Sequence, residues 1–438
     1  MVKTLNTTVS DDKSAALDAA LFPRYKAAYV DILNVVAPDP DSVARERERF
    51  LSDEIENPTF TYHQQRSVDY AANAAALQQL AADIESDRSL PEPVVVAYRG
   101  AITEQLQVIA IAQALQEYSA TGDGERFAAE LTPLVTEIYG RPRLDTFNDI
   151  FGRFQAEFTE SSRNHESPAA RRLQELTTGY VRSLHPPHMP PPADIRDGTG
   201  VCTKSTELAA AFREGFSVLG ITDWSVMVSA YASTIRVVPS AGCIWIPNDS
   251  ELSVRAKPLT PNAVLGLIAH EIGTHVLRQV RGATSSLQLL SLGLAGYEAG
   301  EEGLAMYREQ QYTGLADFAG VDGYLAAGLA EGLDGHVPRT YREVFTILVD
   351  YFSVVRQVDR QTARILAWQR CLRTFRGTPG DIRGCIFTKD IVYRDGNIAT
   401  WLQMQDGTFD DLDLDRGKFD QTNSEHRALL CELARISH

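Results

Sequence analysis

The sequence predicts an α+β protein that is mainly helical, with one small β-sheet. Amphipathic segments with apolar residues at helical spacing fill most of the first 185 residues. Three short β-branched and aromatic segments follow between residues 224 and 248, separated by small residues. An apolar segment that carries histidine and glutamate comes directly after them. This order predicts helices around a small sheet that precedes a functional helix.

The first predicted unit is a helical region over residues 1–185. The segment "DKSAALDAALFPRYKAAYVDILNVV" has helical periodicity and ends before Pro38. The segment "ERFAAELTPLVTEIYG" ends at Gly140, with Pro142 close behind, which is a common signal for the end of a helix. We therefore expect this region to pack as helices on the rest of the chain.

A proline-rich connection is predicted over residues 186–200. The stretch "HPPHMPPPADIRDGTG" contains five prolines, which exclude a regular helix or a central strand. His185 and His188 have no carboxylate or thiol at ligand spacing, so no metal site is predicted there. Residues 201–438 form the second predicted region.

The second region begins with a predicted β meander. Its segments are "WSVMVSAY" (224–231), "STIRVVPS" (233–240) and "GCIWIPN" (242–248). The last is a candidate edge strand for binding a peptide backbone, although an ordinary strand fits it equally well. A long helix is predicted over residues 343–370. The segment "GCIFTKDIVYRDGN" (384–397) predicts a strand and a turn, and "SEHRALLCELARI" predicts a final helix.

Charge and composition restrict the partners and the location. The net charge of −16 opposes nucleic acid or an anionic membrane as the main partner, because both attract clustered Lys and Arg. No stretch approaches the roughly 18 uninterrupted apolar residues of a membrane span, and the start lacks the apolar core of a secretory signal. The five cysteines are scattered and odd in number, which does not suggest a disulfide framework. We expect a cytoplasmic protein with reduced thiols.

The segment "LIAHEIGTHVLRQ" (267–279) resembles a zinc-protease helix with one residue too many. His270 and His275 are five residues apart. At about 100° per residue, this spacing places them about 140° apart on a regular helix, where they cannot share an ion. A π turn absorbs one inserted residue. Gly273 tolerates unusual dihedral angles, and Thr274 can bond to a displaced carbonyl, so the spacing predicts a widened helix.

Zinc in hydrolytic sites takes three protein ligands, commonly two histidines and a carboxylate. Glu271, next to the first histidine, can point toward the bound water and act as general base. The third ligand is expected on the helix "AGYEAGEEGLAMYREQQ" (295–311), which offers Glu298, Glu301 and Glu302. Spacing alone does not decide between Glu298 and Glu302 as ligand or as the carboxylate that orients a histidine.

"HEIGTH" (270–275) together with "EEGLA" (301–305) resembles the family of tyrosine carboxypeptidases with an H-E-x-x-x-H motif. That family includes the microtubule-associated tyrosine carboxypeptidases and the bacterial proteins labelled flavohemoglobin expression-modulating QEGLA motif protein. Looser matches extend over "NPTFTY" (57–62), "EIYGRP" (137–142) and "FTKDIVYRDG" (387–396).

The resemblance implies a zincin-like metallopeptidase core over residues 201–438, with one Zn²⁺ held by His270, His275 and Glu302. It implies a carboxypeptidase in which Glu271 activates a zinc-bound water. The substrate would be the C-terminus of a peptide or protein, with Tyr or Phe as candidate terminal residues. Glu301 stands where the QEGLA label has Gln, which we expect to place another carboxylate beside the metal and to change the pKa of its water.

Further side chains are candidates for substrate binding. Arg373 and Arg376 in "CLRTFRGT" could bind the terminal carboxylate, because Arg binds carboxylates bidentately; they could equally be surface charges. Tyr393 is a candidate donor to the oxyanion, and Lys389 could serve either role.

Two other functions remain open at this point. One is a zinc endopeptidase, and the other is a non-catalytic regulatory or binding protein of the same fold. The presence of all four core positions favours catalysis. Tubulin is a poor candidate substrate, because a chain with a net charge of −16 repels an acidic tail.

Overall fold

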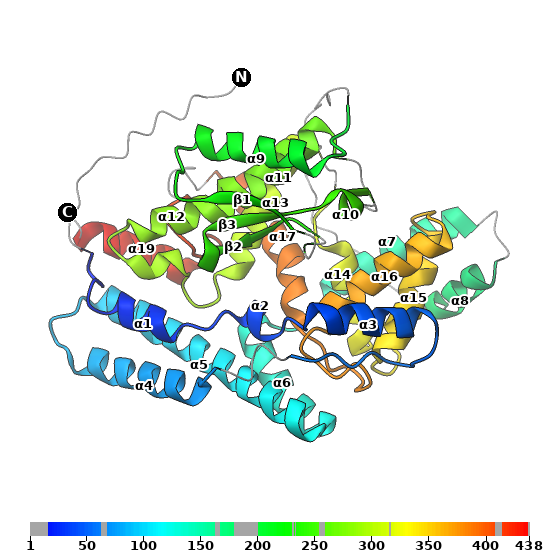
Figure 1. Cartoon of the computed structure of the whole chain (residues 1–438), viewed down its shortest axis with the longest axis horizontal. Coiled ribbons are helices and arrows are strands. Elements are labelled where there is room, and N and C mark those ends of the chain that lie inside the picture. Colours follow the sequence, from blue (N-terminus) through cyan, green and yellow to red (C-terminus); the bar gives the residue numbers. More distant parts are fainter. Residues whose placement is uncertain are drawn as a thin grey trace.

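The predicted mainly helical α+β fold is confirmed. The computed structural model describes residues 16–62, 68–162, 167–178, 200–229, 232, 234–253, 259–314, 317–407 and 414–436. Within these residues, helices surround one three-stranded sheet (Figure 1). Most of the predicted proline-rich connection lies outside the described residues, as do His185 and His188.

The described part of the first 185 residues forms helices, as predicted. The longest is α5 (Glu92–Thr121), which starts after Pro91 and ends at Gly122, where a φ of 71° suits glycine. By length and composition α5 could cross a membrane, but 56% of its most apolar window is buried inside the fold. The other helices are α1 (Phe22–Ala28), α2 (Ile32–Val35), α3 (Pro40–Leu51), α4 (Tyr70–Ser86), α6 (Gly124–Tyr139), α7 (Leu144–Ser162) and α8 (Pro168–Thr177).

The sheet is not the predicted meander. It contains β1 (Ser225–Ser229), β2 (Arg236–Val238) and β3 (Cys243–Pro247) in the order β1-β3-β2, with β1 parallel and β2 antiparallel to β3. The segment 242–248 therefore lies at the centre, and its prediction as an edge strand is wrong. β3 is the most buried strand, and a central position pairs both of its edges.

Two predictions for the last third of the chain are also wrong. The helix predicted over 343–370 is two helices, α15 (Tyr341–Val354) and α16 (Arg360–Thr374), because the chain turns at Gln357 and Asp359 caps α16. The strand predicted at 384–397 is a short 3-10 turn (Thr388–Ile391) followed by α17 (Val392–Gln405). The remaining helices are α9 (Ser205–Val218), α10 (Asp249–Ser253), α11 (Pro261–His270), α12 (Leu277–Ala283), α13 (Glu298–Thr313), α14 (Val321–Glu331) and α19 (Ser424–Ile436).

Helices α13 and α17 touch backbone to backbone. A Cβ atom built on Gly396 would lie 1.8 Å from the carbonyl oxygen of Ala299, and one on Gly303 would lie 2.2 Å from the carbonyl oxygen of Gly396. Gly396 is therefore part of a helix contact rather than of the predicted turn. Gly303, the glycine of "EEGLA", sets the distance between the two helices.

Replacing Gly303 should destabilise the protein strongly. We expect Gly303→Ala to lower the free energy of unfolding by about 3 kcal/mol or more, because its methyl group overlaps a backbone that cannot move aside. Gly100→Ala is the matched control, since Gly100 also lies inside a helix but its Cβ would meet Ala295 Cβ at an ordinary 3.4 Å. That control should stabilise the protein by up to about 1 kcal/mol. Urea unfolding measures both, and equal stabilities would refute the close contact.

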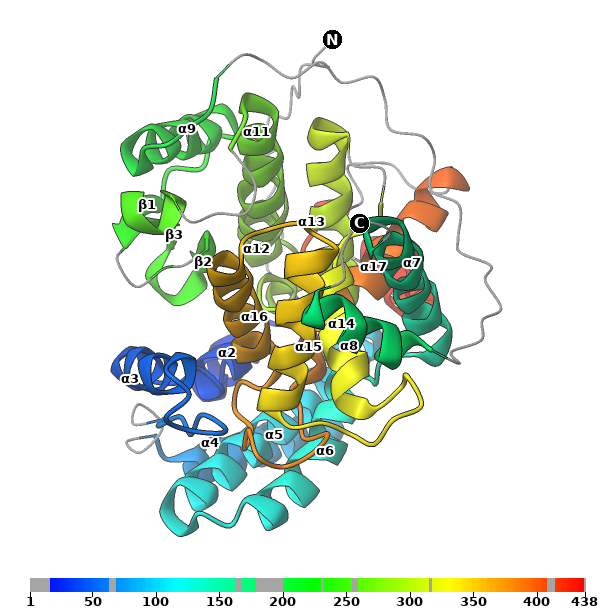
Figure 2. The same cartoon turned by 90° about the vertical axis from the view of Figure 1, so that its right-hand side faces the viewer.

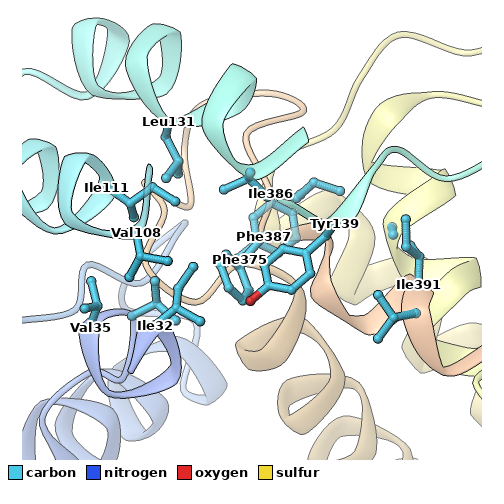
Figure 3. Close-up of a cluster of buried hydrophobic side chains, with 14 of the residues drawn as sticks. Ile32, Val35, Val108, Ile111, Leu131, Tyr139, Phe375, Ile386, Phe387 and Ile391 are labelled. Atoms are coloured by element: carbon cyan, nitrogen blue, oxygen red, sulfur yellow. The ribbon is translucent and has the colours of Figure 1, made fainter. Parts of the chain in front are cut away.

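The buried side chains form two clusters. The larger one joins the N-terminal helices to α14, α15, α16 and α17, and so includes residues on both sides of the proline-rich connection. Figure 3 shows part of it, where Tyr139 from α6 lies beside Phe375 and Phe387 from the C-terminal part of the chain. The N-terminal helices thus share one core with the elements that flank the candidate site.

The smaller cluster lies between α9, the sheet and the helix that carries the two histidines. It includes Phe212, Ile244, Ile272 and Val276. Figure 2 shows α9 and the sheet on one side of α11 and α12, with α13 on the other side. The histidine helix is therefore fixed by packing from the sheet side and from α13.

Candidate metal centre

The helix that carries the histidines is widened where the spacing predicts. After α11 the backbone forms a π turn over Glu271–Val276 and then returns to α-helix in α12. Thr274 Oγ1 donates a hydrogen bond to the carbonyl oxygen of Ala269 at 3.1 Å, as predicted for a displaced carbonyl. The ring centroids of His270 and His275 lie 5.0 Å apart, so the extra residue brings both imidazoles to one side.

Gly273 contributes less to this turn than the sequence suggests. A Cβ atom there would meet nothing closer than the carbonyl oxygen of Ile268, at 3.8 Å. A larger side chain would therefore fit at position 273. Side chains that donate to the displaced carbonyls contribute more to stabilising the turn than Gly273 does.

Glu302 completes a set of three donors. Its Oε2 atom lies 3.9 Å from His270 Nε2 and 3.6 Å from His275 Nε2. Two ligand atoms at 2.0–2.2 Å from a tetrahedral ion lie roughly 3.3–3.6 Å apart, so the three atoms are close to the separation that one zinc ion requires. Among the described residues, Glu302 Oε2 is buried and accepts no hydrogen bond. A buried carboxylate oxygen without a partner is costly unless a cation occupies the space beside it.

The other ring nitrogens are held by carboxylates. Glu309 Oε2 lies 3.1 Å from His270 Nδ1, and Glu301 Oε1 lies 2.9 Å from His275 Nδ1. With a carboxylate at each Nδ1 atom, Nε2 is the ring nitrogen of each histidine that faces Glu302. Burial alone would lower the pKa of His270, but the bond to Glu309 and the charges of Glu271, Glu309 and Glu302 raise it to about 9. The surroundings therefore favour a cation at this point.

Glu301 differs from the expectation that it adds a carboxylate beside the metal. Glu301 contacts the Nδ1 atom of His275, so the imidazole ring separates its carboxylate from the Nε2 atom that faces Glu302. Its Oε2 atom accepts a hydrogen bond from the fully buried Arg278, whose Nη2 donates to the carbonyl oxygen of Phe419. Burial raises the pKa of Glu301, but Arg278 and His275 outweigh it and hold the pKa at about 2. Its charge is thus balanced by Arg278.

Glu271 is placed to exchange protons. Its carboxylate and the ring nitrogens of His270 and His275 lie within 4.8 Å of one another. Burial raises the pKa of Glu271, the two histidines lower it, and Glu302 and Glu309 raise it again, with a net increase. A buried carboxylate with a raised pKa accepts a proton more readily, which suits a general base.

Glu298, the alternative left open by spacing, has other partners. Its Oε1 atom lies 2.9 Å from Lys389 Nζ and 3.4 Å from the hydroxyl of Tyr139. Burial lowers the pKa of Lys389, but the charges of Glu298 and then Glu302 raise it on balance, so the ammonium stays charged. Lys389 is therefore a paired cation within reach of the field of Glu302, rather than a free one.

Arg373 and Arg376 are ion-paired rather than free surface charges. Both bind the buried Asp390, at 2.8 Å and 2.9 Å, and Arg370 joins them at 2.9 Å. Burial raises the pKa of Asp390, but the arginines hold it far below its usual range. Three guanidinium groups on one carboxylate leave two positive charges in excess. The Nε atom of Arg376 is also buried without a hydrogen-bond partner among the described residues.

Tyr393 lies on α17, not on the predicted strand. It is near Arg373 and within the electrostatic influence of Glu302. The guanidinium carbon of Arg373 is 5.5 Å from the centre of its ring. Burial and the charge of Glu302 raise the pKa of Tyr393 to about 12. Its hydroxyl therefore keeps its proton at neutral pH and remains a hydrogen-bond donor.

Sequence reasoning missed three charged residues around the site: Glu309, Arg278 and Arg308. Glu309 lies seven residues after Glu302, two helical turns along the same face of α13, so helical spacing could have found it. No comparable signal marks the two arginines, because each contacts a segment far away in the sequence.

Comparisons with known proteins give one distant similarity. The human microtubule-associated tyrosine carboxypeptidase 1 is 32% identical over 141 residues, which cover 30% of this chain and 26% of that protein. The chain thus matches about a quarter of the length of this relative. No protein-family model and no solved structure matches the chain.

Proposed function

We propose that this protein is a zinc-dependent carboxypeptidase that removes the last residue of a peptide or protein. The observation that carries the proposal is the convergence of His270 Nε2, His275 Nε2 and the unpartnered Glu302 Oε2 beside Glu271. Two imidazoles and one carboxylate are a donor set typical of hydrolytic zinc. The distant similarity to a tyrosine carboxypeptidase supports the choice of reaction.

His270, His275 and Glu302 would hold the ion, with Glu309 and Glu301 fixing the two imidazoles. When bound, zinc supplies a Lewis acid that polarises the scissile carbonyl and lowers the pKa of a neighbouring water. Glu271 takes the proton of the attacking water at its carboxylate and delivers it to the leaving amine. Tyr393, whose hydroxyl stays protonated, donates a hydrogen bond to the developing oxyanion.

The excess positive charge around Asp390 would bind the free carboxylate of the substrate. Arg373 and Arg376 are the candidate donors, and Arg373 lies 5.5 Å from the ring of Tyr393. Lys389 contributes to the same field while paired with Glu298. If a substrate backbone adds to the sheet, β2 would receive it, since β2 is an edge strand and packs against the π turn.

A peptide digest tests the proposal. Zinc-loaded protein is incubated with peptides that vary at the last position, each made as the free acid and as the C-terminal amide, and the products are identified by mass spectrometry. We expect removal of single residues from the acids, with the amides resistant because they lack the charge that the arginines bind. Internal cuts, or equal cleavage of acids and amides, would indicate an endopeptidase instead. No cleavage of any peptide would favour the non-catalytic alternative.

A further inference from the structure

The π turn has a second support besides Thr274, and it comes from a distant segment. Arg308 on α13 donates from Nη1 to the carbonyl oxygen of Gly273, inside the turn, and the same atom lies 3.5 Å from Thr274 Oγ1. An inserted residue displaces carbonyls from the regular four-residue ladder, and buried carbonyls need a donor. Arg308 supplies that donor from outside the helix.

Arg308 is itself held in place. Its Nη2 atom donates to Asp415 Oδ1 at 2.8 Å, and its side chain is only 18% exposed. Asp415 belongs to residues 414–423, which also contact Arg278 through the carbonyl oxygen of Phe419. Backbone hydrogen bonds from Lys418 to Leu290 and from Leu294 to Lys418 fix this segment. The guanidinium is therefore oriented by a carboxylate on a fixed segment, which suits a rigid contact rather than a chance one.

Position along α13 connects this contact to the metal ligands. The same helix carries Glu301 and Glu309, which hold the two imidazoles, and Glu302, the carboxylate donor. Arg308, on the same helix, donates a hydrogen bond to the backbone between the two histidines. The relative orientation of His270 and His275 depends on how that backbone is wound.

We propose that Arg308, oriented by Asp415, is a positioning residue that holds the π turn open so that His270 and His275 can share one ion. The inference rests on the metal centre of the proposed function. Without the guanidinium, the carbonyl of Gly273 loses this side-chain donor, and the turn relaxes toward windings in which the two imidazoles diverge. Metal affinity then falls although every ligand is still present.

The test compares Arg308→Met and Arg308→Lys with Arg281→Gln as the matched control. Arg281 also pairs with Asp415, at 3.4 Å, but it lies in α12, beyond the end of the π turn at Val276. Co²⁺ binding is followed by titration and by visible absorption, which reports coordination geometry. Amide hydrogen exchange of residues 269–277 is measured in the metal-free protein, and thermal unfolding checks that each variant folds.

Arg308→Met should bind Co²⁺ roughly 10- to 100-fold more weakly, with an altered absorption spectrum and faster exchange in residues 269–277. Arg308→Lys should recover part of the loss, because an ammonium can still donate to the carbonyl. Arg281→Gln should stay within about twofold of the unmodified protein. Wild-type affinity, spectrum and exchange in Arg308→Met would overturn the proposal.

If Arg308→Met does not fold, Asp415→Asn replaces it. That change weakens the orientation of Arg308 and should shift affinity and exchange in the same direction by a smaller amount; unchanged values overturn the proposal. The readouts also separate this inference from the proposed reaction. An unmodified protein that binds Co²⁺ but cleaves no peptide contradicts the peptidase alone, whereas one that binds no Co²⁺ contradicts both.

Discussion

Zinc-loaded protein that carries Glu271→Gln should lose about 100- to 10,000-fold in kcat. The amide of glutamine has nearly the shape of the carboxylate, but it cannot take the proton of the attacking water. It also cannot return a proton to the leaving amine, so both steps assigned to Glu271 fail together. The zinc ligands are untouched, and KM for a trimmed peptide should change much less than kcat.

The measurement is a steady-state assay with the metal content of each preparation determined in parallel. Equal zinc content in the two proteins shows that the loss comes from proton transfer rather than from an empty site. The pKa of Glu271, raised mainly by burial, adds a pH signature. Activity should fall as the pH drops toward that pKa, since the protonated carboxyl cannot act as a base. Cleavage that survives in the zinc-bound variant would remove Glu271 from the mechanism.

The second large effect is expected from Glu302→Gln. Zinc affinity should fall by more than the roughly 10- to 100-fold that loss of an outer hydrogen-bond partner costs, because a charged ligand is lost. The metal-free protein should become more stable by about 1–3 kcal/mol, since the buried charge on an oxygen without a hydrogen-bond partner is replaced by a neutral amide. Affinity and stability therefore move in opposite directions. Titration against a competing chelator and urea unfolding of the metal-free protein measure the two quantities.

The neighbouring residue provides the control for this pair of effects. Glu301→Gln also removes one carboxylate from the same helix turn, but it leaves the fully buried Arg278 without its counter-charge. We expect the metal-free protein to lose about 3–5 kcal/mol of stability, the cost of breaking a buried ion pair. If Glu302→Gln destabilises the metal-free protein as Glu301→Gln does, Glu302 is a structural residue and not a ligand.

The sequence was most informative where geometry allowed few solutions. Histidines five residues apart cannot share an ion on a regular helix, so a π turn was the natural repair, and Thr274 was the evident side chain to support it. The choice between Glu298 and Glu302 was beyond spacing, because residues four apart share a face. It depends on how α13 is rotated against α11, and that rotation is set by contacts with distant segments.

The wrong predictions have the same origin. The short apolar runs within residues 384–397 do not distinguish a buried helix from a strand. The close packing of α17 against α13 stabilises the helix there. β3 was placed at an edge because chain order suggested a meander, whereas its burial on both sides requires the centre. In both cases the structure depends on a partner element elsewhere in the chain, α13 for α17 and β1 for β3, which the local sequence does not identify.

The contacts of α13 also determine where the chain can tolerate insertions. Four side chains of α13 contact the histidine helix at successive positions: Glu301, Glu302, Arg308 and Glu309. The register of α13 against that helix therefore determines which residues meet. One residue added between Glu302 and Arg308 would rotate everything beyond it by about 100° and advance it by about 1.5 Å. His270 and the π turn would both lose their partners while Glu302 stayed in place.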